Sequence, residues 1–165
     1  VHITGVDHSA SMLEQCQRKG IADEVVCQDV RKGLPFAKGR FDCVIAGGIM
    51  EFLGRPVSVF GEVARLLAPD GVFTVTSETT ATRDLYKPRF FSGIIEETPH
   101  KIIVRRAVRG TFPPRSYRKY LYSRETMEEF LFEAGFDVQT VRQVEAYRWS
   151  DDERIAYSLF VSRNV

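Results

Sequence analysis

The sequence predicts an α/β protein built on a mostly parallel β-sheet that ends in an antiparallel strand pair. The first observation is that strand-like and helix-like segments alternate over residues 1–77, which is typical of parallel strands joined by crossover helices on both sheet faces. The second is that residues 136–144 and 155–161 both read as strands. A short reversal near residues 150–152 joins them, which favours antiparallel pairing.

Length and composition fit one globular domain. The chain has 165 residues, of which 44% are apolar and 27% are charged, as in ordinary globular proteins. Its formal net charge of +1 excludes a globally basic nucleic-acid binder. No apolar run approaches the roughly 20 residues that span a membrane, and no signal-peptide pattern opens the chain. We therefore expect a cytoplasmic domain without membrane contact.

Cysteine and histidine usage predicts no metal site. Cys16, Cys27 and Cys43 lie in helix-like or strand-like segments and form no C-x-x-C pair, which favours buried, reduced thiols. The three histidines are isolated from one another in the sequence.

The first predicted strand ends at Asp7 and leads into a helix. Ser9 or Ser11 is expected to cap this helix, and Ser11 with Glu14 fits a capping box. Gly20 fits the C-terminal cap, because glycine adopts a positive φ without strain.

A second strand is predicted at residues 24–28 and a third at residues 41–46, and each is followed by residues suited to a ligand. Asp29 follows the second strand. Gly47 and Gly48 follow the third, where small residues let a ligand approach the backbone.

The next predicted helix begins at Pro56, because proline suits the first helical turn. Apolar residues then recur at helical spacing up to Leu67. Asp70 lies in a turn that leads into a fourth strand at residues 72–77, which is rich in β-branched residues.

The alternation of strands and helices breaks at residues 78–122. This region contains four prolines and one segment, residues 101–108, that reads as a strand or hairpin. Non-repetitive regions of this length are typically functional or disordered. Regular structure returns with a helix capped by Ser123 and ended by Gly135.

Five short segments, taken in chain order, resemble motifs of class I S-adenosylmethionine-dependent methyltransferases. They are Gly5-Val6-Asp7 with Met12-Leu13, Gln28-Asp29-Val30 with Leu34-Pro35-Phe36, Phe41-Asp42-Cys43-Val44-Ile45 with Gly47-Gly48, residues 64–73, and Glu133-Ala134-Gly135-Phe136. The resemblance covers residues 1–77 and 122–165 and implies a Rossmann-like three-layer sandwich. In that family a further strand and a glycine-rich loop come before this point, and we expect the parent protein to have them.

The resemblance implies an S-adenosylmethionine site at the strand ends. Its members would be Asp7, His8, Met12, Asp29, Val30, Ala46, Gly47 and Gly48. By this resemblance Asp7 would bind the ribose hydroxyls, and His8 and Met12 would flank the adenine.

The same resemblance assigns the remaining contacts. Asp29 would accept a hydrogen bond from the adenine amino group, with the Val30 backbone beside it. Residues 46–48 would line the methionine end of the cofactor, next to the substrate.

Structural interpretations of these residues stay open. Asp7 also fits a cap for the helix that follows it, and Asp29 fits a turn residue. No catalytic residue is identified. Glu51 fits either a substrate-side base or a solvated acid at a helix start, and His100 and Tyr117 are further candidates for a base.

Eight basic residues and no acidic ones lie between residues 98 and 124, interleaved with aromatic residues. The basic residues are Lys101, Arg105, Arg106, Arg109, Arg115, Arg118, Lys119 and Arg124, and the aromatic ones are Phe112, Tyr117, Tyr120 and Tyr122. Such a stretch suits an anionic substrate, a carrier protein's phosphopantetheine or RNA. The alternative is a solvated hairpin that faces acidic neighbours such as Glu96, Glu97 and Glu125.

The resemblance implies a single methyltransferase-like domain. Residues 1–77 would be its cofactor-binding half, residues 78–122 its insertion or substrate region, and residues 123–165 its closing helix and strands. The expected function is methyl transfer from S-adenosylmethionine to a small-molecule acceptor, mainly by proximity and orientation. A carrier-bound or nucleic-acid substrate stays open. So do a non-catalytic methyltransferase-like binding domain and an NAD-type Rossmann oxidoreductase, which a strand-end acid would also suit.

Overall fold

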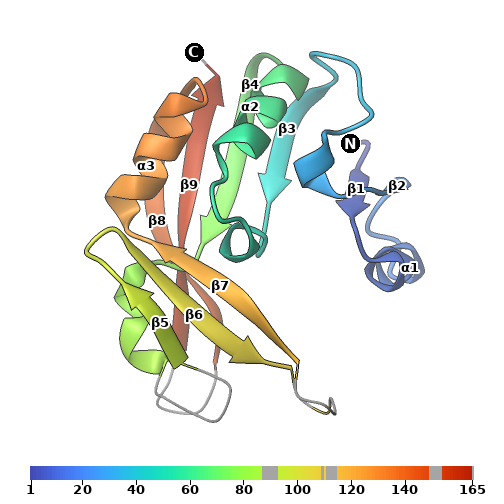
Figure 1. The fold of residues 1–165 in the computed structure, drawn as a ribbon. Helices are drawn as coiled ribbons and strands as arrows, with labels where there is room; N and C mark the ends of the chain where they lie inside the picture. Colours follow the sequence, from blue (N-terminus) through green and yellow to red (C-terminus); the bar gives the residue numbers. More distant parts are fainter. Residues whose placement is uncertain (87–92, 109, 111–114, 149–153, 165) are drawn as a thin grey trace. The chain divides into compact units, whose positions relative to one another are not determined.

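The computed structural model describes residues 1–86, 93–108, 110, 115–148 and 154–164 (Figure 1). It contains two compact units, an N-terminal unit of residues Val1–Ala37 and a C-terminal unit of residues Lys38–Val165.

The N-terminal unit consists of a parallel strand pair and the helix that connects its strands. Its elements are β1 (Thr4–Asp7), α1 (Ala10–Arg18), β2 (Glu24–Cys27) and the short 3₁₀ turn η1 (Val30–Lys32). β1 and β2 pair in parallel, with Asp7 beside Cys27. This arrangement confirms the predicted strand–helix–strand pattern at the start of the chain.

Short-range signals set the two ends of α1. The Asp7 carboxylate accepts a hydrogen bond from the Ser9 N–H at 2.8 Å, which turns the chain so that Ser9 becomes the N-cap. Because the helix begins at this point, Ser11 lies inside it, and the predicted capping box at Ser11 and Glu14 is wrong. Gly20 has a φ of 62° just beyond the helix, as predicted for the residue that ends it.

The C-terminal unit is built on a four-stranded sheet in the order β3-β4-β9-β8. Its strands are β3 (Phe41–Ala46), β4 (Leu67–Ser77), β8 (Phe136–Arg148) and β9 (Arg154–Asn164). β3 and β4 pair in parallel and are connected through α2 (Val57–Leu66). β4 pairs antiparallel with β9, and β9 pairs antiparallel with β8.

The predicted antiparallel pair at the C-terminus is confirmed, but the mostly parallel sheet is not. Among the described pairings, β1–β2 and β3–β4 are parallel and the others are antiparallel. The parallel pairs arise where a crossover helix returns the chain to the same end of the sheet. The reversal predicted near residues 150–152 lies outside the described residues.

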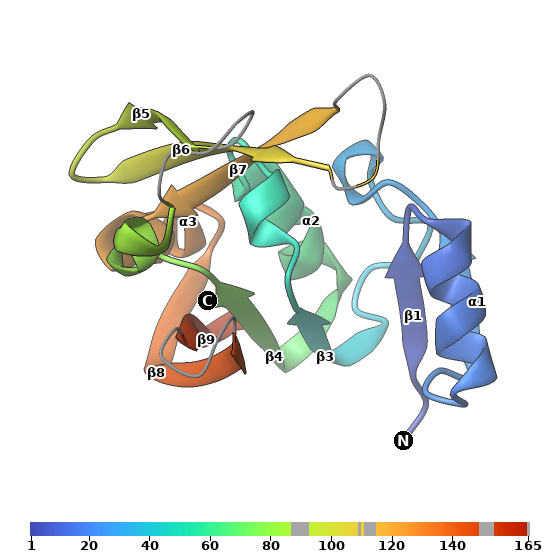
Figure 2. The same ribbon diagram turned by 90° about the horizontal axis from the view of Figure 1, so that it is seen from below.

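Two helices of the C-terminal unit cover one face of its sheet. They are α2 and α3 (Arg124–Glu133), which contact each other while α2 packs on β4 and α3 on β8 (Figure 2). Ser123 caps α3 as predicted, since its hydroxyl accepts a hydrogen bond from the Thr126 N–H at 3.2 Å. A three-layer sandwich stays a prediction.

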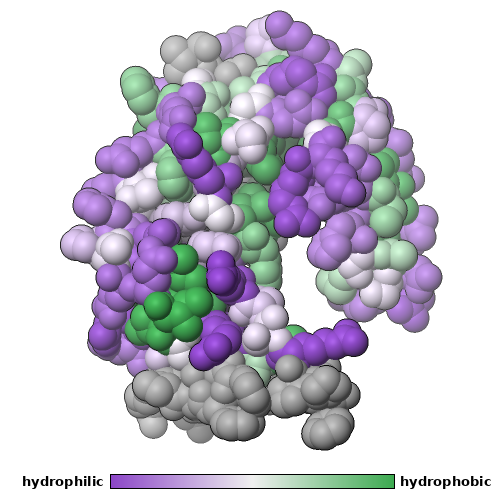
Figure 3. Space-filling view, viewed as in Figure 1, coloured by the Kyte–Doolittle hydropathy of each residue, from purple (hydrophilic) through white to green (hydrophobic). Residues whose placement is uncertain are grey.

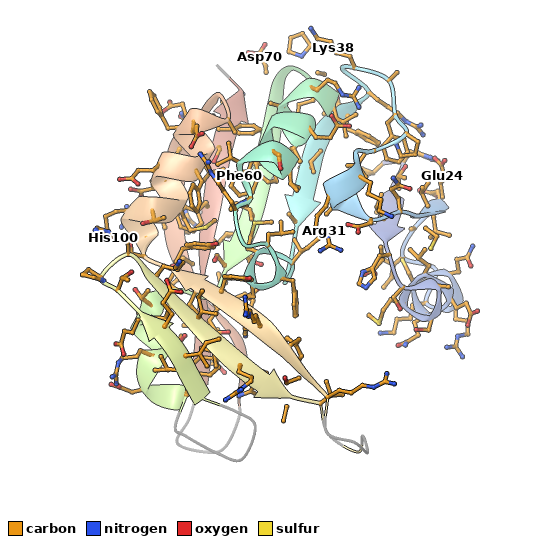
Figure 4. The ribbon with its side chains drawn as sticks, viewed as in Figure 1. Glu24, Arg31, Lys38, Phe60, Asp70 and His100 are labelled. Atoms are coloured by element: carbon orange, nitrogen blue, oxygen red, sulfur yellow. The ribbon has the colours of Figure 1, made fainter. Side chains whose placement is uncertain are left out.

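Aromatic side chains fill the space between these helices and the sheet. Phe60, labelled in Figure 4, comes from α2 and is fully buried. Its ring contacts Phe73 of β4 edge to face at 5.4 Å between centroids, and Phe73 contacts Phe136 at 5.1 Å. These contacts hold α2, β4 and β8 in one core.

Asp70 and Gly71 carry an unusual bend near the start of β4. Asp70 has a φ of 62°, a conformation that aspartate tolerates better than most non-glycine residues. A Cβ added to Gly71 would stand 2.8 Å from the Ala68 carbonyl oxygen, so glycine is required there. The predicted turn is therefore present, but β4 already begins at Leu67.

The region at residues 78–122 forms a second, three-stranded antiparallel sheet in the order β5-β6-β7. Its elements are the 3₁₀ turn η3 (Thr80–Leu85), β5 (Gly93–Glu97), β6 (Lys101–Ala107) and β7 (Ser116–Tyr122). The predicted segment at residues 101–108 is β6, whereas β5 and β7 were not expected. We call β5, β6 and β7 the insertion sheet.

One face of the insertion sheet is packed against the turn η3. Tyr86, Ile102, Val104 and Leu121 form its buried apolar cluster.

Figure 3 shows hydrophobic side chains gathered over β5, where Ile95 is exposed.

Within the described ranges, no helix is long and apolar enough to cross a membrane.

Candidate functional site

Two acids stand at the same edge of the N-terminal strand pair. Asp7 is the last residue of β1, and Asp29 follows β2 by two residues. Because parallel strands end at a common edge, the two segments lie side by side, and the Gln28 N–H donates to the Asp7 carbonyl oxygen at 3.0 Å. Ligands of open α/β sheets bind at this kind of edge.

The Asp7 carboxylate is occupied on one side. Its Oδ1 accepts the Ser9 N–H and lies 3.3 Å from the His8 Nδ1. Its Oδ2 has no partner among the described residues, and 39% of the side chain is exposed. Asp7 thus shapes the turn before α1, although the helix cap itself is Ser9, and it also keeps one oxygen available to a ligand.

The Asp29 carboxylate is held by Arg31. Its Oδ1 accepts the Arg31 backbone N–H at 3.0 Å and the Nε–H at 2.9 Å, and its Oδ2 accepts the Nη2–H at 2.7 Å. The Arg31 guanidinium and backbone N–H hold the pKa of Asp29 well below its usual range. Asp29 therefore caps η1, which agrees with the alternative that made it a turn residue.

The two residues expected to flank the adenine are both exposed. His8 follows Asp7 directly, and Met12 lies in the first turns of α1 with half of its surface exposed. Val30 is half-buried in η1.

The backbone that follows β3 is open to close approach by a ligand. Ala46 ends the strand, and Gly48 has a φ of 64° and donates its N–H to the Thr76 Oγ1 at 3.2 Å. A Cβ built on Gly47 or Gly48 would meet no atom within 4 Å. These glycines therefore do not relieve crowding within the described residues; they leave space beside the carboxyl ends of β3 and β4.

The eight predicted site residues divide between the units. Asp7, His8, Met12, Asp29 and Val30 belong to the N-terminal unit, and Ala46, Gly47 and Gly48 belong to the C-terminal unit.

Glu51 is buried, so its interpretation as a solvated acid is wrong. It lies in the 3₁₀ turn η2 (Met50–Phe52), with 1% of its surface exposed. Neither carboxylate oxygen has a hydrogen-bond partner among the described residues. Packing of η2 against β7 and β4 removes it from water.

The other two candidates for a base are exposed. His100 lies in the turn before β6, and its carbonyl oxygen accepts the Ser123 N–H at 2.8 Å. Tyr117 lies on β7 with its ring centroid 5.6 Å from that of Phe52. No described contact joins either residue to Glu51.

A buried polar cluster was missed by the sequence analysis. Glu78 follows β4 directly, is fully buried, and accepts hydrogen bonds from the Thr82 hydroxyl at 2.8 Å, the Tyr86 hydroxyl and the Lys119 ammonium. The Lys119 Nζ also lies 3.1 Å from the Tyr86 hydroxyl oxygen. We call Glu78, Thr82, Tyr86 and Lys119 the Glu78 cluster. The sequence gives no local signal for this cluster, because Lys119 is one of several basic residues in its segment and Glu78 lies 41 residues away.

The thiols are more exposed than predicted. Cys16 is half-buried, whereas Cys27 and Cys43 are exposed, and all three are free. In the described part of the chain, no group of three or more His, Cys, Asp or Glu side chains is placed to hold a metal ion.

Parallel strands, crossover helices and an available carboxylate at a strand end are typical of nucleotide-binding α/β proteins. Comparisons with known proteins are more specific. Residues 1–75 match the family described as "Methyltransferase domain". Over 98 residues the chain is 32% identical to the malonyl-[acyl-carrier protein] O-methyltransferase of Enterobacter lignolyticus, an alignment that covers 59% of this chain and 38% of that protein.

Two solved structures share the fold over almost the whole chain. A SAM-dependent methyltransferase from Methanosarcina mazei superposes with a TM-score of 0.74 at 14% identity, over 98% of this chain and 81% of that one. A putative S-adenosylmethionine-dependent methyltransferase from Listeria monocytogenes gives 0.75 at 16% identity, over 99% and 80%.

Residues 1–75 are thus similar to a methyltransferase domain, and the whole chain shares the fold of S-adenosylmethionine-dependent methyltransferase structures. The chain spans 38% of the length of the Enterobacter relative. The relatives and structures named here are methyltransferases, not NAD-type oxidoreductases.

Proposed function

We propose that this protein transfers a methyl group from S-adenosylmethionine to a small-molecule acceptor. The similarity of residues 1–75 to a methyltransferase domain, and of 98 residues to a methyltransferase, supports the reaction. The observation that carries the proposal in this chain is the geometry of Asp7, whose Oδ2 is left without a partner at the end of β1. A carboxylate oxygen with free lone pairs accepts hydrogen bonds from the two ribose hydroxyls.

In this proposal the other predicted site residues contact the same cofactor. His8 and Met12 are exposed next to the turn that Asp7 shapes, where an adenine ring would need contacts. Gly47 and Gly48, after Ala46, leave open space where a side chain would obstruct the methionine end.

Asp29 fits the proposed adenine contact if its carboxylate accepts hydrogen bonds from Arg31 and from the adenine amino group together. A carboxylate has about four lone-pair positions. Arg31 directs its backbone N–H, Nε–H and Nη2–H at the Asp29 carboxylate, and the Nε–H is shared between both oxygens, with the longer contact of 3.2 Å to Oδ2. We propose that the adenine amino group donates to Oδ2 in place of this longer contact, beside the Val30 backbone. The low pKa of Asp29 supports this, since it keeps the carboxylate an acceptor.

When bound, S-adenosylmethionine supplies a sulfonium methyl group that is already activated for transfer. The residues of this chain then have to hold the ribose and adenine and align the acceptor at the exit from β3. Such alignment lowers barriers by several kcal/mol without a catalytic side chain. A base is needed only for an acceptor that holds its proton at neutral pH, and we assign none.

The acceptor region in this proposal is the insertion sheet. It follows β4, whose carboxyl end lies beside that of β3, and the Glu78 cluster fixes it there. Acceptor choice commonly depends on such additions to a shared fold. Because the Enterobacter relative is a malonyl-[acyl-carrier protein] O-methyltransferase, we make a carrier-bound acyl group the second candidate acceptor.

We also propose that both units belong to a single cytoplasmic domain. Three free thiols support a reducing compartment.

Calorimetric titration with S-adenosylhomocysteine tests the cofactor site. We expect micromolar binding to the chain and an affinity at least tenfold lower for Asp7→Ala, about 1.4 kcal/mol. Glu14→Ala is the matched control, because Glu14 is an exposed acid on α1 outside the site. Equal affinities for Asp7→Ala and the chain would refute the role of Asp7, and binding of NADH in place of S-adenosylhomocysteine would refute the proposed reaction.

A further inference from the structure

Most cations of the basic stretch are accounted for within the chain. Three have carboxylate partners: Lys101 with Glu96 at 2.7 Å, Lys119 with Glu78, and Arg124 with Glu128 at 2.8 Å. Arg106 lies over the Tyr86 ring, and Arg115 has a further interaction within the chain. Arg109 and Phe112 lie outside the described residues.

Arg105 and Arg118 differ from these basic residues because they have no such partner among the described residues. Neither has a carboxylate partner among the described residues, and both are exposed. They stand directly opposite each other on β6 and β7, in antiparallel register. Residues opposite each other share one face of a sheet, with Cβ atoms about 5 Å apart, and like charges in such a pair destabilise it.

The described neighbours within the insertion sheet do not relieve this repulsion. On the other side of Arg105, the opposing residue on β5 is Gly93, which brings no side chain. No acid occurs in the sequence between residues 98 and 124. The two guanidinium groups therefore form a concentrated positive charge that an external anion would neutralise.

This pair lies on the face of the insertion sheet that contacts Leu53 and Gly54, the segment after η2. Arg118, Tyr120 and Tyr122 alternate along β7 and so share one face. The Tyr122 hydroxyl donates to the carbonyl oxygens of Leu53 and Gly54.

Tyr120 makes the second contact with that segment. A Cβ built on Gly54 would lie 3.4 Å from the Tyr120 ring. Leu53 and Gly54 come directly after η2, and a single residue separates η2 from Gly48. The two arginines thus share a sheet face with the tyrosines that contact the segment following the β3 exit, where we propose that the acceptor is aligned.

We propose that Arg105 and Arg118 form an oxyanion site that holds a carboxylate or phosphate group of the methyl acceptor. A guanidinium is planar, always charged, and matches both anions with two parallel N–H···O bonds. Two of them on one sheet face supply donors to all oxygens of such a group. This inference rests on the proposed function and narrows its substrate class to anionic acceptors.

The test is a titration followed by backbone amide NMR at constant ionic strength, set with sodium chloride. The probes are inorganic phosphate, succinate and 4′-phosphopantetheine. We expect saturable shifts at residues 104–106 and 117–119, and at least fivefold weaker binding for Arg118→Gln and Arg105→Gln. Arg118→Lys keeps the charge but loses the planar fork, so it should bind with intermediate affinity.

The matched control is Lys101→Gln, which removes a cation of the same sheet that is already paired with Glu96. It should bind the probes as the unmodified chain does. Tighter binding of succinate supports an acidic small molecule, and tighter binding of 4′-phosphopantetheine supports a carrier arm. Shifts that are unsaturable, or equal in Arg118→Gln and the unmodified chain, overturn the inference.

The same samples separate this inference from the proposed function. If the unmodified chain binds S-adenosylhomocysteine but none of the anions, the oxyanion site alone is overturned. Anion binding at the arginines without S-adenosylhomocysteine binding overturns the methyltransferase proposal while the anion site stands.

Discussion

Lys119→Met is expected to lower the free energy of unfolding of the C-terminal unit by about 3 kcal/mol. Lys119 is 8% exposed and donates to Glu78, which is fully buried. Breaking a buried pair by removing one partner typically costs about 3–5 kcal/mol, because the other charge is left uncompensated. We take the lower end, since Thr82 and Tyr86 still donate to Glu78 in the variant.

The assay is thermal and urea unfolding followed by near-ultraviolet circular dichroism. For a chain of this size, 3 kcal/mol corresponds to a fall in Tm of about 6–12 °C. The double variant Glu78→Met/Lys119→Met should recover most of the loss, because apolar replacement of both partners of a buried pair is often neutral.

Lys101→Met is the matched control, since the Lys101–Glu96 pair on the same sheet is partly exposed and contributes little. The reasoning fails if Lys119→Met is no more destabilising than Lys101→Met. It also fails if the double variant is less stable than the single one.

Three further predictions concern the C-terminal unit. Glu51→Met should raise the free energy of unfolding by about 1–3 kcal/mol in urea titrations, because it removes a buried carboxylate without a described partner; a loss of stability would show that Glu51 is paired in solution. At Asp70, where φ is 62°, the order of stability should be Gly, then Asp, then Ala, with Ala about 1 kcal/mol below Asp; thermal melts that place Ala above Asp contradict the assigned backbone. Burial raises the pKa of Tyr122 to about 12, so the folded state holds this proton more tightly than the unfolded state. Stability from this group is complete below the unfolded pKa near 10 and falls as the pH rises toward 12. Urea unfolding at several pH values should show a shallower decline for Tyr122→Phe, and an unchanged slope would exclude this group as the cause.

Local patterns predicted much of the fold. The alternation over residues 1–77 correctly gave β1 to β4 with α1 and α2, because each of these elements is set by neighbours in the sequence. Ser123 and Gly135 marked the ends of α3 for the same reason. The mostly parallel sheet was wrong, since the antiparallel pairing of β4 with β9 joins segments that lie far apart in the sequence.

The insertion sheet shows why the rest could not be predicted. Lys119 points inward on β7, which breaks the polar–apolar alternation that identifies a strand. Its burial depends on Glu78, which lies 41 residues away. Glu51 is similar, because η2 is covered by β7 from a distant part of the chain.

The sequence predicted which residues stand at the candidate site, but not the hydrogen bonds that they make there. Asp7 and Asp29 were identified because acids at strand ends follow from the fold. The hydrogen bonds that occupy Asp29 were not, since they depend on the side-chain conformation of Arg31.

Positions of the insertion sheet differ in how freely their residues can change. One face is fixed by the Glu78 cluster and by the apolar contacts of Ile102, Val104 and Leu121, and the other is fixed at Tyr122 by its hydrogen bonds to Leu53 and Gly54. Arg105 and Arg118 are exposed and have no described role in holding the sheet together. A combinatorial library randomised at these two positions should therefore stay folded while its members diverge in ligand preference, which makes this sheet a practical starting point for directed evolution.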